Sequence, residues 1–289
     1  MSVDVGGQMT LWRARTRVRI GALPGSFVLG LSITAFMVVV ALLGPHLVRQ
    51  DPIEMNLHRT LLPPGPGHLL GTDNFGRDVL SRTVSGTSID LQFGLFCVLP
   101  TFITGTLLGA VAGLNRWFDA VLMRVLDLVV AFPFYVVIIA IVAVLGPGVT
   151  NMYIAVMVWG WASYSRVVRN EVLVVKGLDY VSAATVLGLP TVRIIFKHLL
   201  PNVIVQPLVL ATTNFTAYVL LGSALGFLGL GVQPPTPEWG VMIGEGRDFL
   251  GQAPWISIFP GLAILTVCSG WILLGDGLSD LLRPEISRK

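Results

Sequence analysis

The chain has 289 residues, a formal net charge of +3, 54% hydrophobic residues and 12% charged residues. Soluble domains carry about 25% charged residues, so this composition excludes a soluble globular protein and indicates an integral membrane protein. Apolar runs without two-residue alternation, such as Val136 to Leu145 and Ile258 to Val267, exclude a membrane β-barrel. We therefore expect an all-α polytopic membrane fold.

Six apolar stretches are long enough to cross a bilayer, which needs about 20 residues of helix. They lie at residues 26–44, 91–113, 128–146, 152–168, 203–226 and 256–275. The first follows a basic segment and resembles a secretory signal, but its apolar run is too long and no small-residue cleavage pattern follows it. We interpret it as a retained membrane anchor.

The distribution of basic residues predicts the orientation of the spans. If both ends of the chain are cytoplasmic, most of the 19 Lys and Arg residues lie inside, as the positive-inside rule requires. The expected layout is a cytoplasmic segment, 1–24, a transmembrane domain, 25–285, and a tail, 286–289. Because topology accounts for the basic pI, we expect no nucleic-acid partner.

A long loop at about 45–90 follows the first span and is rich in Pro and Gly. It is too polar to lie in lipid, so we expect it to fold on the outer face. Residues 70–82 within it predict a tight, polar turn followed by the start of a helix. The same loop contains His46, His58 and His68, whose wide spacing fits no compact metal motif, so no metal site is predicted.

A polar, helix-forming segment, residues 176–202, separates the fourth and fifth apolar stretches. Asp179 is a good cap for a helix that begins near Tyr180. Gly188 suits the left-handed residue that ends a helix, and Pro190 suits the first turn of the next one. We expect a helix–turn–helix within a long inner loop at about 169–202.

The second helix of this segment carries Arg193 and Lys197, which lie four residues apart on one face. We expect Pro201 to redirect the chain into the membrane. A basic two-helix insert between spans indicates contact with something outside the bilayer. The alternative interpretation is a solvated connector.

The fifth apolar stretch contains a stripe of polar side chains within an arc of about 100°. Such groups favour a bundle interior or a watery cavity over lipid, so the stripe is a candidate wall of a translocation pathway. The alternative is that these groups hydrogen-bond helix to helix. The stripe consists of Gln206, Thr213, Thr216 and Ser223, with Asn214 on its shoulder.

The last loop, at about 229–255, is rich in Pro and contains an amphipathic piece from Trp239 to Leu250. We expect this piece to form a re-entrant or surface helix. Cys97 and Cys268 fall within apolar spans, where a buried, inert thiol is expected.

No catalytic residues are predicted. A phosphate-binding loop needs Gly-Lys-Ser/Thr, and none of Lys176, Lys197 and Lys289 follows a glycine. The chain is therefore not expected to bind ATP or another cofactor, and it contains neither a His-Glu-x-x-His zinc motif nor a Gly-x-Ser-x-Gly elbow.

Four blocks of the sequence carry a family resemblance. Ala183-Ala184, Gly188 and Leu200-Pro201 resemble the "EAA" coupling loop in permease subunits of bacterial ABC importers. Residues 70–82, 226–240 and 274–278, with Pro284 after them, are similar to the C-type permeases of dipeptide, oligopeptide and nickel uptake systems. The resemblance assigns contact with the ATPase to Asp179, Ser182, Ala183, Ala184, Gly188, Arg193, Lys197, Leu200 and Pro201.

This resemblance implies one half of the membrane channel of a type I ABC importer in a bacterial cytoplasmic membrane. The implied partners are membrane lipid, a second, similar permease, two ATPase subunits that bind ATP and Mg, and an extracytoplasmic solute-binding protein. The tight turn of the first outer loop would belong to the docking surface for that protein, through Gly71, Thr72, Asp73, Gly76, Arg77 and Asp78.

The resemblance makes peptides the first choice of substrate, and nickel or another small solute the alternative. A transporter driven by an ion gradient is disfavoured because no charged residue is expected near the middle of a span. One position departs from the family pattern, since Ser182 occupies the place of the usual Glu. A serine offers only a neutral hydrogen bond, so we expect the coupling contact to depend more on Asp179 or on apolar packing.

Overall fold

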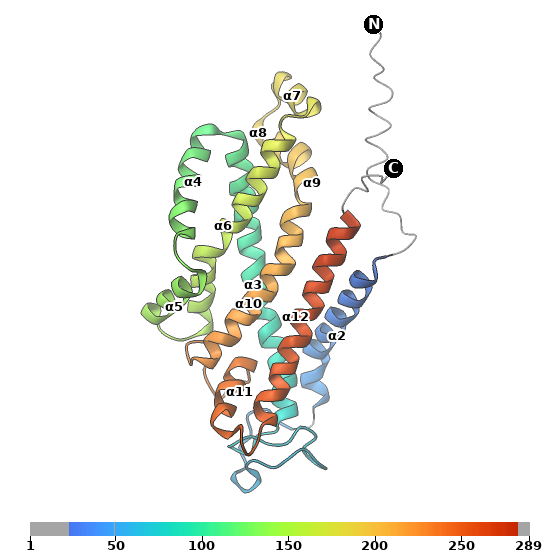
Figure 1. The fold of residues 1–289 in the computed structure, drawn as a ribbon, viewed down its shortest axis with the longest axis vertical. Coiled ribbons are helices and arrows are strands. Elements are labelled where there is room, and N and C mark those ends of the chain that lie inside the picture. Colours follow the sequence, from blue (N-terminus) through green and yellow to red (C-terminus); the bar gives the residue numbers. More distant parts are fainter. Residues whose placement is uncertain (1–22, 49, 283–289) are drawn as a thin grey trace.

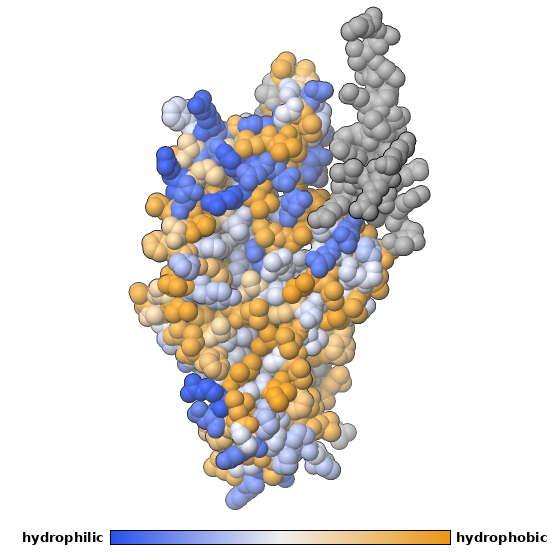
Figure 2. Space-filling model, in the orientation of Figure 1, coloured by the Kyte–Doolittle hydropathy of each residue, from blue (hydrophilic) through white to orange (hydrophobic). Residues whose placement is uncertain are grey.

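A computed structural model describes residues 23–48 and 50–282 of the chain. The described part is built from helices, with isolated β-bridges only in the loop that follows the first of them. Most of the predicted segment 1–24, the tail 286–289 and Pro284 lie outside the described residues. Figure 2 shows apolar residues over the middle of the visible face and hydrophilic residues gathered toward the end that carries α7 and α8.

Within residues 23–48 and 50–282, four helices are long and apolar enough to cross a membrane. They confirm the first, second, fifth and sixth expected spans. These helices are α2 (Gly25–Leu47), α3 (Val79–Leu114), α10 (Val205–Phe227) and α12 (Trp255–Leu282). Helix α3 begins well before residue 91, because Asp78 caps it by accepting a hydrogen bond from the Ser81 N–H at 2.8 Å.

The third expected span, 128–146, is broken. Helix α4 (Arg116–Val130) and helix α5 (Phe134–Leu145) are bent by 82° relative to each other, and together they count as one further span at most. Pro133 causes the break, because proline restricts the preceding residue to extended conformations and starts α5 as its N-cap. Most of α4 lies before residue 128, where the expected span begins.

The fourth expected span, 152–168, belongs to the longer helix α6 (Val149–Val175), which carries too many polar residues to count as an apolar span. Helices α3 and α6 pack closely along their length (Figure 1). Three glycines of α3 permit this approach, since a Cβ on Gly105, Gly109 or Gly113 would meet the backbone or side chains of α6. The Ser165 hydroxyl also donates to the Gly105 carbonyl at 3.1 Å.

Helices α2 and α12 form a second close pair, with α2 on the outside of the bundle. Gly30 of α2 and Gly277 of α12 lie against backbone of the partner helix. Most large side chains of α2 remain exposed, as expected of a helix that faces lipid. Helix α10 packs against both α12 and α3, and α2 contacts α3 directly, which completes the bundle.

The end opposite α7 is closed by the loop from residue 50 to 78 and by helix α11 (Trp239–Gly246). Trp239 is fully buried, and its indole N–H donates to the Thr83 carbonyl at 2.9 Å. Helix α11 therefore packs into the bundle and does not lie free on the surface.

Candidate functional site

The segment between α6 and α10, residues 176–202, is called the platform here. It contains helix α7 (Asp179–Val186), helix α8 (Thr191–Ile194), a π-helical turn (Ile195–Leu199) and the start of α9 (Leu200–Val203). It lies at the end of the molecule farthest from α11 (Figure 1). Lys176 ties it to α3 by donating from Nζ to the Gly113 carbonyl at 2.8 Å.

Helix α7 ends as the sequence predicts, at a left-handed glycine. Gly188 has a φ of +72°. The Leu189 N–H reaches back to the Ala184 carbonyl at 3.2 Å, the hydrogen bond of a Schellman motif. The start differs by one residue, because α7 begins at Asp179 itself, which places that carboxylate in the first turn.

The second half of the platform runs on into α10. Pro190 precedes α8 as its N-cap and does not lie inside it. Pro201 lies in the first turn of α9, and helical structure continues through it, so the expectation that it redirects the chain is wrong. The π-helical turn before it shifts the hydrogen-bond register, which accommodates a residue without an N–H.

The inner face of the platform is apolar and packs on the ends of α3 and α6. Val181, Ala184 and Leu199 are buried against Ala110 and Val172. Burial also raises the pKa of the Tyr180 phenol above its ordinary value. Because this packing is continuous, the platform and the ends of α3 and α6 form one cluster.

The outer face of the platform presents apolar side chains to solvent. Val186 is 87% exposed, Leu187 78% and Val192 66%, at the hydrophilic end of the molecule. Figure 2 shows such apolar residues at the extremity formed by α7. The other exposed residues of this face are Asp179, Ser182, Ala183, Gly188, Arg193, Phe196, Lys197 and Pro201, while Leu200 is half-buried. Exposed apolar side chains at a hydrophilic end of the molecule make this face a candidate site for a protein partner.

The polar stripe of α10 is divided between two environments. Gln206 and Thr213 are exposed, whereas Thr216 and Ser223 are buried inside this chain. Asn214 is half-buried, and its amide lies 3.5 Å from the Ser163 hydroxyl of α6. The structure therefore leaves the part of the stripe nearer the platform accessible and encloses the rest.

An ion pair between α4 and α6 escaped the sequence analysis. Arg166 Nη2 lies 3.3 Å from Asp127 Oδ1, and both side chains are largely exposed. Both residues lie at the boundaries of the expected spans, since α4 begins at Arg116 and α6 continues to Val175.

The six residues assigned to the outer docking surface form a tight turn. Gly71 and Gly76 have φ values of +79° and +71°. Thr72, Asp73, Arg77 and Asp78 are all buried. Their side chains therefore stabilise the loop from inside. They influence the surface by fixing the shape of the loop and make no direct contact there.

Buried charge connects this turn to α11. Arg77 Nε lies 2.6 Å from Asp73 Oδ2, and Arg77 Nη2 lies 2.8 Å from Glu245 Oε2. Arg82 Nη2 also donates to Glu245 Oε2 at 3.0 Å. The four side chains join the first outer loop, α3 and α11 in one network.

Metal-ligating residues are scattered in the part of the chain that the structure describes. No three His, Cys, Asp or Glu side chains gather there as a metal site would require. His68 is instead paired with Asp78, its Nδ1 lying 3.0 Å from Oδ1.

Comparison with known proteins places this architecture in a family. The model of the family described as "Binding-protein-dependent transport system inner membrane component" matches residues 105–288. The dipeptide transport system permease protein DppC of Alkalihalophilus pseudofirmus is 40% identical over 260 residues, covering 90% of this chain and 86% of that protein.

Two further relatives extend the comparison. The di/tripeptide transport system permease protein DppC of Pseudomonas aeruginosa is 41% identical, covering 89% of this chain and 87% of that protein. The glutathione transport system permease protein GsiD of Pectobacterium atrosepticum is 36% identical, covering 95% and 90%. The chain therefore belongs to the family of binding-protein-dependent transport system inner membrane components.

Proposed function

We propose that this chain is one of two membrane subunits of an ATP-driven importer of di- or oligopeptides. Support for peptides comes from relatives named for dipeptide, di/tripeptide and glutathione transport, which cover most of the chain. The alternative in the same family is nickel or another small solute. A bare metal ion gains no support, since no metal-binding cluster occurs among the described residues.

The proposed membrane topology has six crossings in a bacterial cytoplasmic membrane. Helix α6 and the bent pair α4–α5 would cross beside the four apolar helices. Both chain ends would lie in the cytoplasm with the platform, because the described ends of α2 and α12 lie toward that end of the molecule (Figure 1). Basic residues near the platform, among them Arg116, Arg124, Arg169 and Lys176, support this orientation.

The observation that carries the proposal is the exposed apolar surface of the platform. The platform would dock into an ATPase subunit, and two such subunits would bind ATP and Mg for the whole complex. Ser182 can add only a neutral hydrogen bond to this contact, so Val186, Leu187 and Val192 would supply most of its affinity.

The packing of the platform suggests how ATP-driven motion reaches the membrane. Movement of α7 would displace α3 and α6, because Val181 and Ala184 are buried against them, and α10 follows directly from the platform. A pathway between this subunit and a second, similar permease would then alternate between two states with different affinity for substrate. A solute-binding protein would deliver the peptide at the end that α11 closes.

The decisive test is Leu187→Asp in the assembled transporter. Leu187 is 78% exposed, so the change leaves the fold intact while placing a charge in the proposed contact. We expect the ATPase subunits to be lost on purification and ATP-driven uptake of the dipeptide Ala-Phe to fall by at least about tenfold.

The matched control is Leu57→Asp, a 72% exposed leucine in the loop at the opposite end. It should retain the ATPase subunits and their activity. If Leu187→Asp retained both the ATPase subunits and normal uptake, the platform would not be the coupling site, and this proposal would be wrong.

A further inference from the structure

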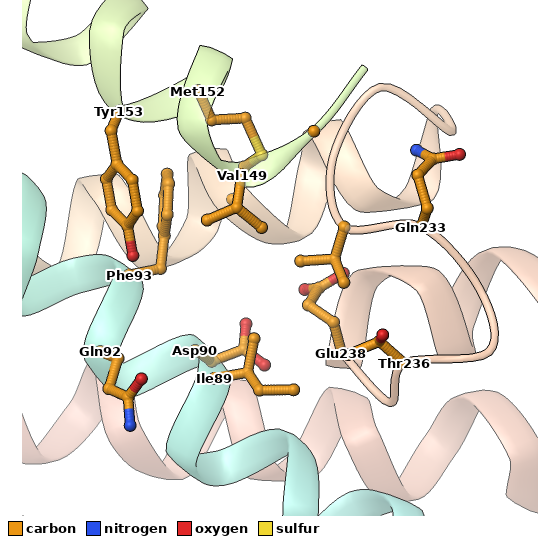
Figure 3. Close-up of a pocket in the computed structure, with 13 residues that line it drawn as sticks. Ile89, Asp90, Gln92, Phe93, Val149, Met152, Tyr153, Gln233, Thr236 and Glu238 are labelled. Carbon is orange, nitrogen blue, oxygen red and sulfur yellow. The ribbon is translucent and has the colours of Figure 1, made fainter. Parts of the chain in front are cut away.

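A cavity of about 490 Å³ lies among α3, α6, α10 and the loop that leads into α11 (Figure 3). Binding sites for small molecules measure about 300–1,000 Å³, so the space would hold an amino-acid residue or a dipeptide. Its lining comprises Ile89, Asp90, Gln92, Phe93, Gly148, Val149, Met152, Tyr153, Gly222, Val232, Gln233, Thr236 and Glu238. None of these side chains is basic.

Two buried carboxylates face this space. Asp90 is 2% exposed and Glu238 is 3% exposed, and Figure 3 shows both carboxyl groups directed toward the open volume. Glu238 accepts hydrogen bonds from the N–H groups of Gly240 and Val241, each at 2.8 Å, and Asp90 accepts one from Trp239 at 3.2 Å. All three donors belong to the first turn of α11.

The N-terminus of α11 offsets only part of the negative charge of Asp90 and Glu238. A helix N-terminus provides about half of one positive charge, whereas two ionised carboxylates carry two negative charges. Burial raises the pKa of Glu238, although the amides of Gly240 and Val241 oppose that change. The pair therefore favours an additional positive group, which can be a shared proton or a bound cation.

A third buried polar group lies at the same place. The Ser223 hydroxyl is 7% exposed and lies against Asp90, yet it forms no hydrogen bond of normal geometry with any residue that the structure describes. Its neighbour Gly222 lines the cavity. The hydroxyl therefore lies behind Asp90 as an additional donor to that carboxylate, at the edge of the cavity.

The remaining wall is aromatic and apolar. The rings of Phe93 and Tyr153 are stacked with centroids 5.3 Å apart, and Val149 and Met152 lie beside them (Figure 3). This wall suits an organic body better than a hydrated metal ion. Two carboxylates are also too few for a metal cage built from side chains.

We propose that this cavity binds the α-ammonium group of a peptide, with the first side chain of the peptide against Phe93 and Tyr153. The proposal rests on the proposed function and identifies a substrate contact within it. The ammonium group donates up to three hydrogen bonds, which match the acceptors of Asp90, Glu238 and Ser223. Its charge replaces the proton that the two carboxylates would otherwise share.

The first experiment places a competing cation at the mouth of the cavity. Thr236 lines the cavity from an exposed loop position, so Thr236→Lys supplies a tethered ammonium group without disturbing the core. In proteoliposomes that contain the complete transporter and its binding protein, we expect uptake of Ala-Phe to fall by about tenfold. Thr236→Gln has a similar length and no charge, and its smaller loss measures the effect of size alone.

The second experiment removes one charge from the pair. Asp90→Asn keeps a carbonyl oxygen for the Trp239 N–H, and we expect it to raise the KM for Ala-Phe by about tenfold. Asp248→Asn removes an exposed carboxylate on the same side of the molecule and should leave uptake at the wild-type level.

The outcomes separate the two proposals. If the wild-type transporter imported no peptide with ATP, the proposed function would fail. If it imported Ala-Phe while Thr236→Lys matched Thr236→Gln, the ammonium site would be refuted by itself. Should Asp90→Asn fail to assemble, the Thr236 pair still decides the matter.

Discussion

The α11 end and the platform end of this molecule differ in how their polar and apolar side chains are arranged. At the α11 end, Asp73, Arg77, Arg82 and Glu245 are held in one network, three of them almost fully buried, so the polar groups of the loop find partners inside the chain. At the platform end, apolar side chains such as Leu187 are exposed beside hydrophilic residues. The α11 end also exposes leucines, among them Leu57, so the buried charge network is what distinguishes it from the platform.

From this difference we expect the α11 end to contribute mainly to the stability of the fold and the platform to bind a partner. The buried network fixes the first outer loop against α11, and Arg82 Nη1 also donates to the Pro235 carbonyl at 3.4 Å, next to Thr236 of the cavity lining. The platform is fixed only on its inner face, through Val181 and Ala184. Changes in the buried network should therefore act mainly on stability, and changes on the exposed face of the platform mainly on assembly and coupling.

The largest effect on stability is expected from Arg77→Ala in the buried network at the α11 end. This change leaves Asp73 and Glu245 with one buried cation, Arg82, instead of two, and the loss of one partner from a buried ion pair costs about 3–5 kcal/mol. We expect a corresponding fall in the free energy of unfolding in detergent. Arg247→Ala removes an exposed arginine and should change stability by less than about 0.5 kcal/mol. Equal effects would show that the network does not hold the loop.

A smaller effect is expected from Gly188→Ala in the platform. No atom lies within 4 Å of the added Cβ, so the change acts only through the left-handed backbone, which costs about 1 kcal/mol for alanine. Hydrogen exchange of the Leu189 amide should become about fivefold faster. Gly177→Ala, at a glycine without a positive φ, is the matched control and should leave this exchange unchanged.

The smallest stability effect is expected from Asp127→Asn, which removes the ion pair with Arg166. Both side chains are largely exposed, and such pairs contribute about 0–1 kcal/mol when they face water. The unfolding free energy of the assembled complex should therefore fall by less than about 1 kcal/mol. A loss of 3 kcal/mol or more would indicate that the pair lies in lipid, where an unpaired arginine is costly.

Local sequence signals predicted the helices well where no distant contact was needed. Runs of apolar residues located α2, α3, α10 and α12, because a helix that crosses lipid must satisfy its own backbone and present apolar side chains. Gly188 was identified as a helix end from its identity alone, since only glycine adopts a left-handed conformation without strain. The family was likewise accessible from short blocks of sequence.

Other features depended on which helices meet. The 82° bend at Pro133 divided an apolar stretch that the sequence predicted as one span. The polar side chains of α6 are compatible with a packed helix because α3 covers one face of α6. The turn around Arg77 was predicted, but its burial against Glu245 was not, since 168 residues separate the two.

The sequence by itself determined the membrane class, the apolar helices and the helix–turn–helix outline of the platform, because these follow from local hydrophobicity and backbone preference. Only the tertiary structure decided that Asp90 and Glu238 share one cavity and that Ser223 lies against them. The physical reason is that burial and charge pairing arise between side chains far apart in the chain, and no local pattern records how closely α3, α10 and the start of α11 approach.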